Sequence, residues 1–268
     1  MAIPIPRTID VDLASVPRHW MAGHAAATAL SNGINMLFPH GERFFVRSVH
    51  HYAERITDPE LRAQVKAFFK QEGHHAAAHD DYNRVMRAQG FEIDRFLRRY
   101  GAITQWIERV IPPALNLAGT AAAEHYTAIL AEGAFAKGAL DHAHPEMQRL
   151  LAWHAAEEIE HRAVAFDVLQ QVAPSYVLRM AGLAYATVML ALFWAWATGM
   201  LLRQEGYGPL RALRELATLR DEDPVIRRVF VAGIRQYIRR RFHPRDNRID
   251  HLARDWFAAH DLPFTEAA

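Results

Sequence analysis

The sequence predicts an all-α protein built on a ferritin-like four-helix bundle, with a long crossover connection and extra C-terminal helices. Three observations carry this prediction. No strand-like alternation of any length occurs along the 268 residues, and apolar residues recur at helical spacing in segments without breakers. The pattern Glu-x-x-His also occurs twice, each time with a lone glutamate on the preceding helical segment. The predicted parts are an N-terminal arm at 1–30, the bundle at 31–175, and an apolar helix with a polar helical tail at 176–268.

Start and stop signals define the helices of the bundle. The first main helix follows Pro39 and has Glu42 within its first turns. Asp58-Pro59 is typical of a helix start, with an N-cap and a proline at the first helical position, and Gly90 ends the helix that it opens. The predicted main helices are about 40–57, 59–88, 114–137 and 145–172, and residues 91–113 form the crossover with a short helix at 96–110.

An uncharged apolar segment of 23 residues runs from Met180 to Leu202, between Arg179 and Arg203. Its length would suffice to cross a bilayer. The alternatives are a helix buried in the domain, in a dimer interface, along a substrate cavity or against a membrane surface. The following flank is rich in arginine, so the positive-inside rule would leave the bundle on the far side of the membrane without a signal sequence. Surface docking or burial is therefore favoured over a span.

Composition excludes several classes of function. The net charge of +1 gives no general case for nucleic-acid binding. The absence of cysteine excludes disulfides, thiolate zinc sites, iron–sulfur clusters and a cysteine nucleophile. The N-terminus has no apolar signal region. We expect a cytoplasmic protein that forms a homodimer, with membrane association through 180–202 as an open alternative.

The two Glu-x-x-His copies point to a metal site. Each copy puts a carboxylate and an imidazole one turn apart on the same helix face. Together with the two lone glutamates they form the ligand set of a two-metal site in a four-helix bundle. Two of the four glutamates, Glu72 and Glu158, are expected to bridge the metals, and all four carboxylates are candidate catalytic groups. The predicted metal ligands are Glu42, Glu72, His75, Glu124, Glu158 and His161.

Three further residues lie near these positions. His154 is four residues before Glu158, where it is expected to be a third imidazole ligand or to orient a carboxylate. His79, four residues after His75, is an additional ligand or a hydrogen-bond partner of one. Asp167 is six residues after His161 and either bonds a ligand imidazole or lies in solvent.

The segments 39–45, 71–79, 123–128 and 153–167 resemble a bacterial family described as predicted metal-dependent hydrolases, over roughly residues 30–260. The resemblance implies metal dependence more firmly than hydrolysis, because the hydrolase label is itself a prediction. The ligand order also resembles ferritin-like di-iron carboxylate proteins. The run His154-x-x-x-Glu158-x-x-His161 is similar to the histidine-rich site of di-iron arylamine N-oxygenases, a likeness that covers only the site.

Three functions follow as expectations. The first is an enzyme that uses two metal ions, iron by preference and manganese or zinc as alternatives, to activate O2 and oxidise an apolar or aromatic small molecule. It would need an external electron donor. The second is a two-metal hydrolase of an ester or phosphoester. The third is a metal-binding protein without catalytic activity, since the fold alone does not settle function.

Overall fold

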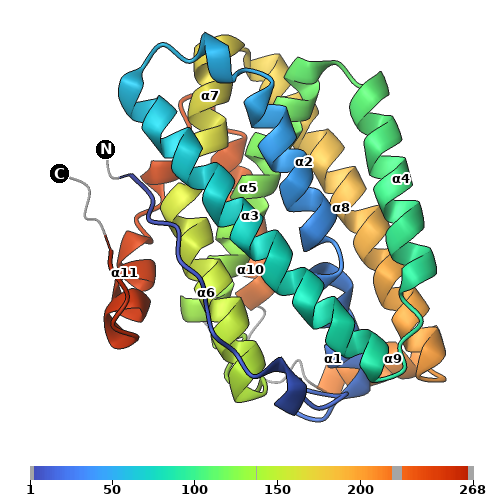
Figure 1. The fold of residues 1–268 in the computed structure, drawn as a ribbon. Helices are drawn as coiled ribbons and strands as arrows, with labels where there is room; N and C mark the ends of the chain where they lie inside the picture. Colours follow the sequence, from blue (N-terminus) through green and yellow to red (C-terminus); the bar gives the residue numbers. More distant parts are fainter. Residues whose placement is uncertain (1–2, 137, 219–224, 265–268) are drawn as a thin grey trace.

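The computed structural model describes residues 3–136, 138–218 and 225–264, and in these ranges the chain folds into helices without a β-strand (Figure 1). The predicted all-α class is confirmed, whereas the assignment to the ferritin-like type stays a prediction. The α-helices are α1 (Ala25–Asn35), α2 (Phe38–His50), α3 (Pro59–Ala88), α4 (Asp94–Val110), α5 (Pro113–Ala136), α6 (Pro145–His161), α7 (Val164–Val172), α8 (Tyr176–Gln204), α9 (Pro209–Thr218), α10 (Val225–Tyr237) and α11 (Asp250–Ala259).

Four of these helices enclose the centre of the molecule. Helix α2 contacts α3 and α5, and α6 contacts the same two helices from the other side, so the four form a closed ring. Helix α5 is rich in alanine, and Ala118, Ala121 and Ala122 are fully buried. Small side chains let the neighbouring helices approach α5 closely. The crossover prediction is matched by α4, which joins α3 to α5 and packs against α2.

Local signals account for the start of α3. The side chain of Asp58 accepts a hydrogen bond from the Glu60 amide at 2.9 Å, and Pro59 occupies the first helical position. The N-cap therefore satisfies one of the amide donors that a helix start leaves free. Helix α2 ends at His50, earlier than the predicted 57, and a short 3-10 turn over Ala53–Arg55 connects it to α3.

The predicted helix at 145–172 is wrong as a single element, because α6 ends at His161 and α7 begins at Val164. No glycine or proline marks this break in the sequence. The Arg162 side chain is buried in the turn, where it donates to the carbonyl of Ile159 and pairs with Asp250 of α11 at 2.7 Å. These contacts satisfy a carbonyl released at the helix end and tie the turn to the C-terminal helix.

The N-terminal arm is shorter than predicted, because α1 begins at Ala25 inside the range 1–30. The run Ala25–Ala29 favours helix, and the glycine before it, Gly23, has a φ of 76° that lets the chain turn into the helix. Upstream of the turn the segment follows α6 across the face of the bundle (Figure 1). The arm is thus part of the packed structure.

The apolar segment 180–202 lies in α8, which packs against α5 and α1. Gly182 sits on the backbone of Ala118, where an added Cβ would lie 2.4 Å from a backbone atom. Within the described residues α8 is the one helix with the length and composition of a membrane span, yet only 22% of its most apolar window is buried. Burial in the domain therefore explains the apolar side chains on the inner side of α8 but not those on its outer side.

The predicted helical tail is formed by α9, α10 and α11. Helix α10 packs on α5, and α11 packs on α6 and α5. The predicted end of the third main helix, at 137, lies outside the described residues.

Candidate metal centre

The six predicted ligands and two further histidines converge inside the ring of α2, α3, α5 and α6. Glu42 comes from α2, Glu124 from α5, and the remaining ligands from α3 and α6. Four overlapping groups each bring three donor atoms within 4.8 Å of one another. The groups are Glu72–Glu124–His161, Glu42–Glu72–His75, His75–His154–Glu158 and Glu42–His79–His154.

The donor atoms of this cluster are buried, and most of its carboxylate oxygens lack hydrogen-bond partners. Each of the four glutamates and four histidines is at most 3% exposed. Within the described part of the chain, both carboxylate oxygens of Glu42, Glu72 and Glu124 have no hydrogen bond, nor do Glu158 Oε2 and His75 Nδ1. Burying carboxylates without partners costs free energy, and bound cations would offset that cost.

The outer nitrogen of His161 is held by a hydrogen-bonded chain. Gln71 donates through its amide to Glu160 at 2.9 Å, which leaves its carbonyl oxygen 3.0 Å from His161 Nδ1. His161 Nδ1 therefore donates to this oxygen, and Nε2 is the nitrogen that faces inward. This Nε2 lies 3.1 Å from Glu72 and 3.3 Å from both Glu124 and Glu158. An imidazole nitrogen among three carboxylates is well placed to exchange its proton for a metal ion.

His75 is oriented by a buried ion pair. Its Nε2 donates to Glu157 at 2.9 Å, so Nδ1 is directed toward Glu158. Glu157 in turn accepts from the Arg7 amide at 2.9 Å and from the Arg7 guanidinium at 3.2 Å. The same guanidinium pairs with Glu160, the residue that holds Gln71, at 2.8 Å. One arginine of the N-terminal arm thus supports the outer contacts of two ligand imidazoles.

His79 acts on His154 in the same manner. His79 Nδ1 donates to Asn35 Oδ1 at 2.6 Å, so its Nε2 accepts from His154 Nδ1 at 2.6 Å. The Nε2 of His154 faces the centre, where it is hydrogen-bonded to Glu158 at 2.8 Å and lies 3.6 Å from Glu42. The arrangement favours His154 as a ligand and His79 as the residue that fixes its orientation.

The pKa values of the cluster show that the buried carboxylates repel one another. Burial, followed by the repulsion of neighbouring carboxylates, raises the pKa of Glu42 and of Glu72 well above the usual range. Burial raises the pKa of Glu124 to about 7 against the attraction of His161. Although burial lowers it, the nearby Glu158 and Glu124 together hold the pKa of His161 well above its usual value. Positive charge is favoured at this centre, as two divalent cations would provide.

The residues present fit a pair of metal ions. The donors are carboxylate oxygens and imidazole nitrogens without sulfur, a set suited to iron, manganese or zinc. Glu42, Glu72, Glu124 and Glu158 offset the charge of two divalent cations, and three inward imidazole nitrogens complete the set.

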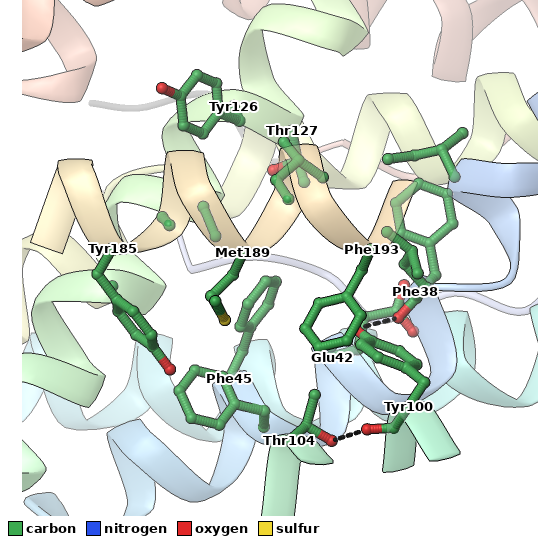
Figure 2. Close-up of a pocket in the computed structure, with 18 of the residues that line it drawn as sticks. Phe38, Glu42, Phe45, Tyr100, Thr104, Tyr126, Thr127, Tyr185, Met189 and Phe193 are labelled. Atoms are coloured by element: carbon green, nitrogen blue, oxygen red, sulfur yellow. Dashed lines mark hydrogen bonds between the residues drawn. The ribbon is translucent and has the colours of Figure 1, made fainter. Parts of the chain in front are cut away.

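An apolar cavity of about 130 Å³ lies beside the cluster, between α2, α4, α5 and α8 (Figure 2). Glu42 belongs to both, since it joins two of the donor groups and also lines the cavity. In Figure 2 its side chain lies near Phe38, Tyr100 and Phe193, with Phe45 further along the cavity. Among the residues that line the cavity there is no lysine, arginine or histidine. An apolar protein cavity of about 150 Å³ is known to bind benzene, so a cavity of similar size suits a small uncharged molecule.

One predicted residue lies apart from the centre, and several supporting residues, Glu157 and Arg7 among them, escaped prediction. Asp167 pairs with His243 at 2.8 Å instead of a ligand imidazole. Glu157 adjoins the ligand Glu158, but its sequence neighbourhood does not distinguish it from a surface glutamate. Arg7 lies in a segment without periodicity and meets its partners across 150 residues, so no sequence signal pointed to it.

Comparison with known proteins agrees with this geometry. The model of the family described as "Predicted metal-dependent hydrolase" matches residues 5–248. No curated protein and no solved structure matches the chain. Because the match covers nearly the whole sequence, including the arm with Arg7 and every helix that supplies a candidate ligand, the chain belongs to the family of predicted metal-dependent hydrolases.

Proposed function

We propose that the protein is a two-metal hydrolase that cleaves a small, uncharged, apolar ester. The observation that carries the proposal is that Glu42 belongs to the buried donor cluster and also lines a cavity without cationic side chains. The family description favours hydrolysis. The apolar lining favours a carboxylic ester over a phosphoester, because a phosphate group would need cationic partners in the cavity.

The chain supplies orientation and exclusion of bulk water. Gln71, Glu157 and His79 hold the outer nitrogens of His161, His75 and His154, so the inner nitrogens stay fixed on the centre. Phe38, Phe45 and Phe193 would hold the apolar part of the substrate beside Glu42. Two bound divalent cations would supply Lewis acidity toward a water molecule and the ester carbonyl.

Oxidation with O2 is the second candidate, and the donor set favours it. Four glutamates and imidazoles that converge from four helices match the ligand pattern of di-iron and di-manganese carboxylate proteins. The same apolar cavity would keep water from a reactive centre. This activity would need iron and an external electron donor, which hydrolysis does not.

Metal loading and oxygen dependence separate the two candidates. The full chain is purified, its metals are counted, and it is reloaded separately with zinc, manganese or iron. Hydrolysis of a chromogenic apolar ester without oxygen, in proportion to metal content, supports the first candidate. Oxygen uptake by the reduced iron form without ester cleavage overturns it in favour of the second.

Two variants tie either activity to the site. Glu72→Gln is expected to lose metal and activity together, since it removes a charge from two donor groups. Glu54→Gln changes an exposed glutamate after α2 and is the matched control, expected to keep both. Metal-independent activity in Glu72→Gln would show that the reaction occurs elsewhere.

A further inference from the structure

Helix α8 carries an apolar stripe on its outer side. Val188, Leu192 and Trp196 follow one another at intervals of four residues, and the first two are 50% and 60% exposed. Neighbouring exposed positions on this side include the alanines Ala184, Ala191 and Ala195. Large apolar side chains on a free helix face are uncommon unless something covers them.

Helix α4 carries a matching stripe. Ile103, Trp106 and Val110 are exposed and spaced by three and four residues, and Trp106 is 62% exposed. The stripe extends the edge of α4 that faces α8, because Phe96, seven residues before Ile103, contacts Trp196 with ring centroids 4.8 Å apart. The two stripes therefore lie along the groove between α4 and α8, two helices that Figure 1 shows side by side and that together line the cavity and a surface hollow.

One end of the groove is cationic. A hollow at the start of α4 and the end of α8 is lined by Arg95, Arg99 and Arg203 together with Trp196 and Met200. Among the described residues no carboxylate lies within ion-pairing distance of these three arginines. Glu92 and Asp94 also border the hollow, but Asp94 already pairs with Arg87 at 2.7 Å.

The cavity approaches the surface at the same groove. Thr104 and Ile107 of α4 and Tyr185 and Met189 of α8 line the cavity and are only half-buried. Figure 2 shows Tyr185, Met189 and Thr104 on one side of the cavity with Glu42 beyond them. A guest that enters between α4 and α8 would cross apolar side chains along the route to the carboxylate.

We propose that the α4–α8 face docks on a lipid bilayer with anionic headgroups and takes its apolar substrate from that bilayer. The two stripes enter the boundary between headgroups and acyl chains, as the apolar face of an interfacial helix does. Arg95, Arg99 and Arg203 bind headgroup phosphates, and Trp196 lies between the cationic and apolar parts, a position that tryptophan favours at membrane interfaces. The delivery of substrate rests on the proposed function, whereas the docking does not.

The packing of α8 argues for a surface position instead of a span. Its inner side is fixed to α5 at Gly182 and to α1 at Gly33, where an added Cβ would lie 2.4 Å from Thr198. Crossing the bilayer would remove these close contacts and expose the small residues of the inner face. A second copy of the chain would also cover the apolar stripes, so the test below includes that outcome.

Flotation of the full chain with vesicles tests the docking, with and without added metal. Binding to phosphatidylcholine vesicles that contain phosphatidylglycerol is expected, with weaker binding to pure phosphatidylcholine. The triple variant Arg95→Gln/Arg99→Gln/Arg203→Gln should bind anionic vesicles roughly a hundredfold more weakly, because each basic residue near such a surface contributes about 1 kcal/mol and three are removed. The matched control Lys66→Gln/Lys70→Gln/Arg84→Gln removes three exposed charges of α3 and should bind as the wild type does.

Trp106 supplies a local readout. Its fluorescence should shift to the blue when anionic vesicles are added, and Trp106→Phe should lose the shift while vesicle binding persists. Leu192→Glu should abolish binding without changing the helical circular dichroism, because the side chain is exposed. Equal binding by the arginine triple variant, or no shift of Trp106, would refute the docking.

Two other outcomes also overturn the proposal. If Leu192→Glu turns a dimer into a monomer and the wild type ignores vesicles, the face joins two copies of the chain. If the protein stays in membranes through alkaline carbonate extraction, α8 crosses the bilayer. An active enzyme that fails to bind vesicles would reject the docking and leave the proposed function intact.

Discussion

Arg7 offers the sharpest test of how the candidate centre is held together. The residue is 5% exposed, and its guanidinium pairs with Glu157 and Glu160 and lies 3.6 Å above the ring of Phe257. Arg7→Met keeps much of the side-chain length and removes the charge. Both carboxylates, whose side chains are 0% and 7% exposed, would then lack their cation.

The loss in stability can be estimated from this geometry. Removing one partner of a buried ion pair costs about 3–5 kcal/mol, because the other charge stays buried without compensation. In a chain of this size each kcal/mol lowers the melting temperature by about 2–4 °C, so Tm should fall by about 6–20 °C. Misplaced outer contacts of His75 and His161 should also weaken metal binding by about 10–100-fold.

Calorimetry and metal titration of Arg7→Met against wild type give both quantities. If Arg7→Met fails to fold, Arg7→Lys keeps the charge without the planar fork and should show intermediate effects. Adding Glu157→Gln and Glu160→Gln to Arg7→Met removes the stranded charges and should recover part of the lost Tm. Unchanged Tm and unchanged metal affinity in Arg7→Met would refute the support assigned to this residue.

Three further predictions address the ligands, the cavity and pH. Glu158→Ala should lower metal content sharply in elemental analysis, because Glu158 is expected to bridge; two retained metals per chain would disprove the ligand assignment. Met189→Trp should fill part of the cavity and lower kcat/KM for apolar substrates at unchanged metal content; unchanged kinetics would place the substrate elsewhere. In metal-free protein, the raised pKa of Glu124, about 7, means that the unfolded chain ionises first as pH rises. Glu124→Gln should therefore match wild type near pH 4.5 and become more stable by up to about 3 kcal/mol above pH 7 in denaturant titrations, whereas a constant difference would contradict the shift.

The shared orientation of the candidate ligands Glu158 and His161 was predictable because it depends on local geometry. Three residues separate Glu158 from His161, and one helical turn puts both on the same face whatever the rest of the fold does. The break between α6 and α7 was not predictable, because it depends on Arg162 and on Asp250, which lies 88 residues further along the chain. Long-range pairing of this kind leaves no periodic trace in the sequence.

The apolar cavity and the role of Arg7 were hidden for the same reason. Phe45 lies on α2 and Phe193 on α8, and only the assembled structure shows that they line one cavity. The apolar character of the segment 180–202 is evident from the sequence. Which of its side chains are buried depends on the helices that cover it. Partial burial is a property of the assembled molecule.

Since the Glu42 carboxylate belongs to both the donor cluster and the cavity lining, binding in the cavity and binding of metal ions are expected to be coupled. A guest that presses on this side chain changes the affinity for cations, and thermodynamic reciprocity requires that cations change the affinity for the guest by the same factor. The empty and filled states of the cavity are thus expected to differ in how tightly the protein retains its ions, so that a chain short of metal would also discriminate poorly among its guests.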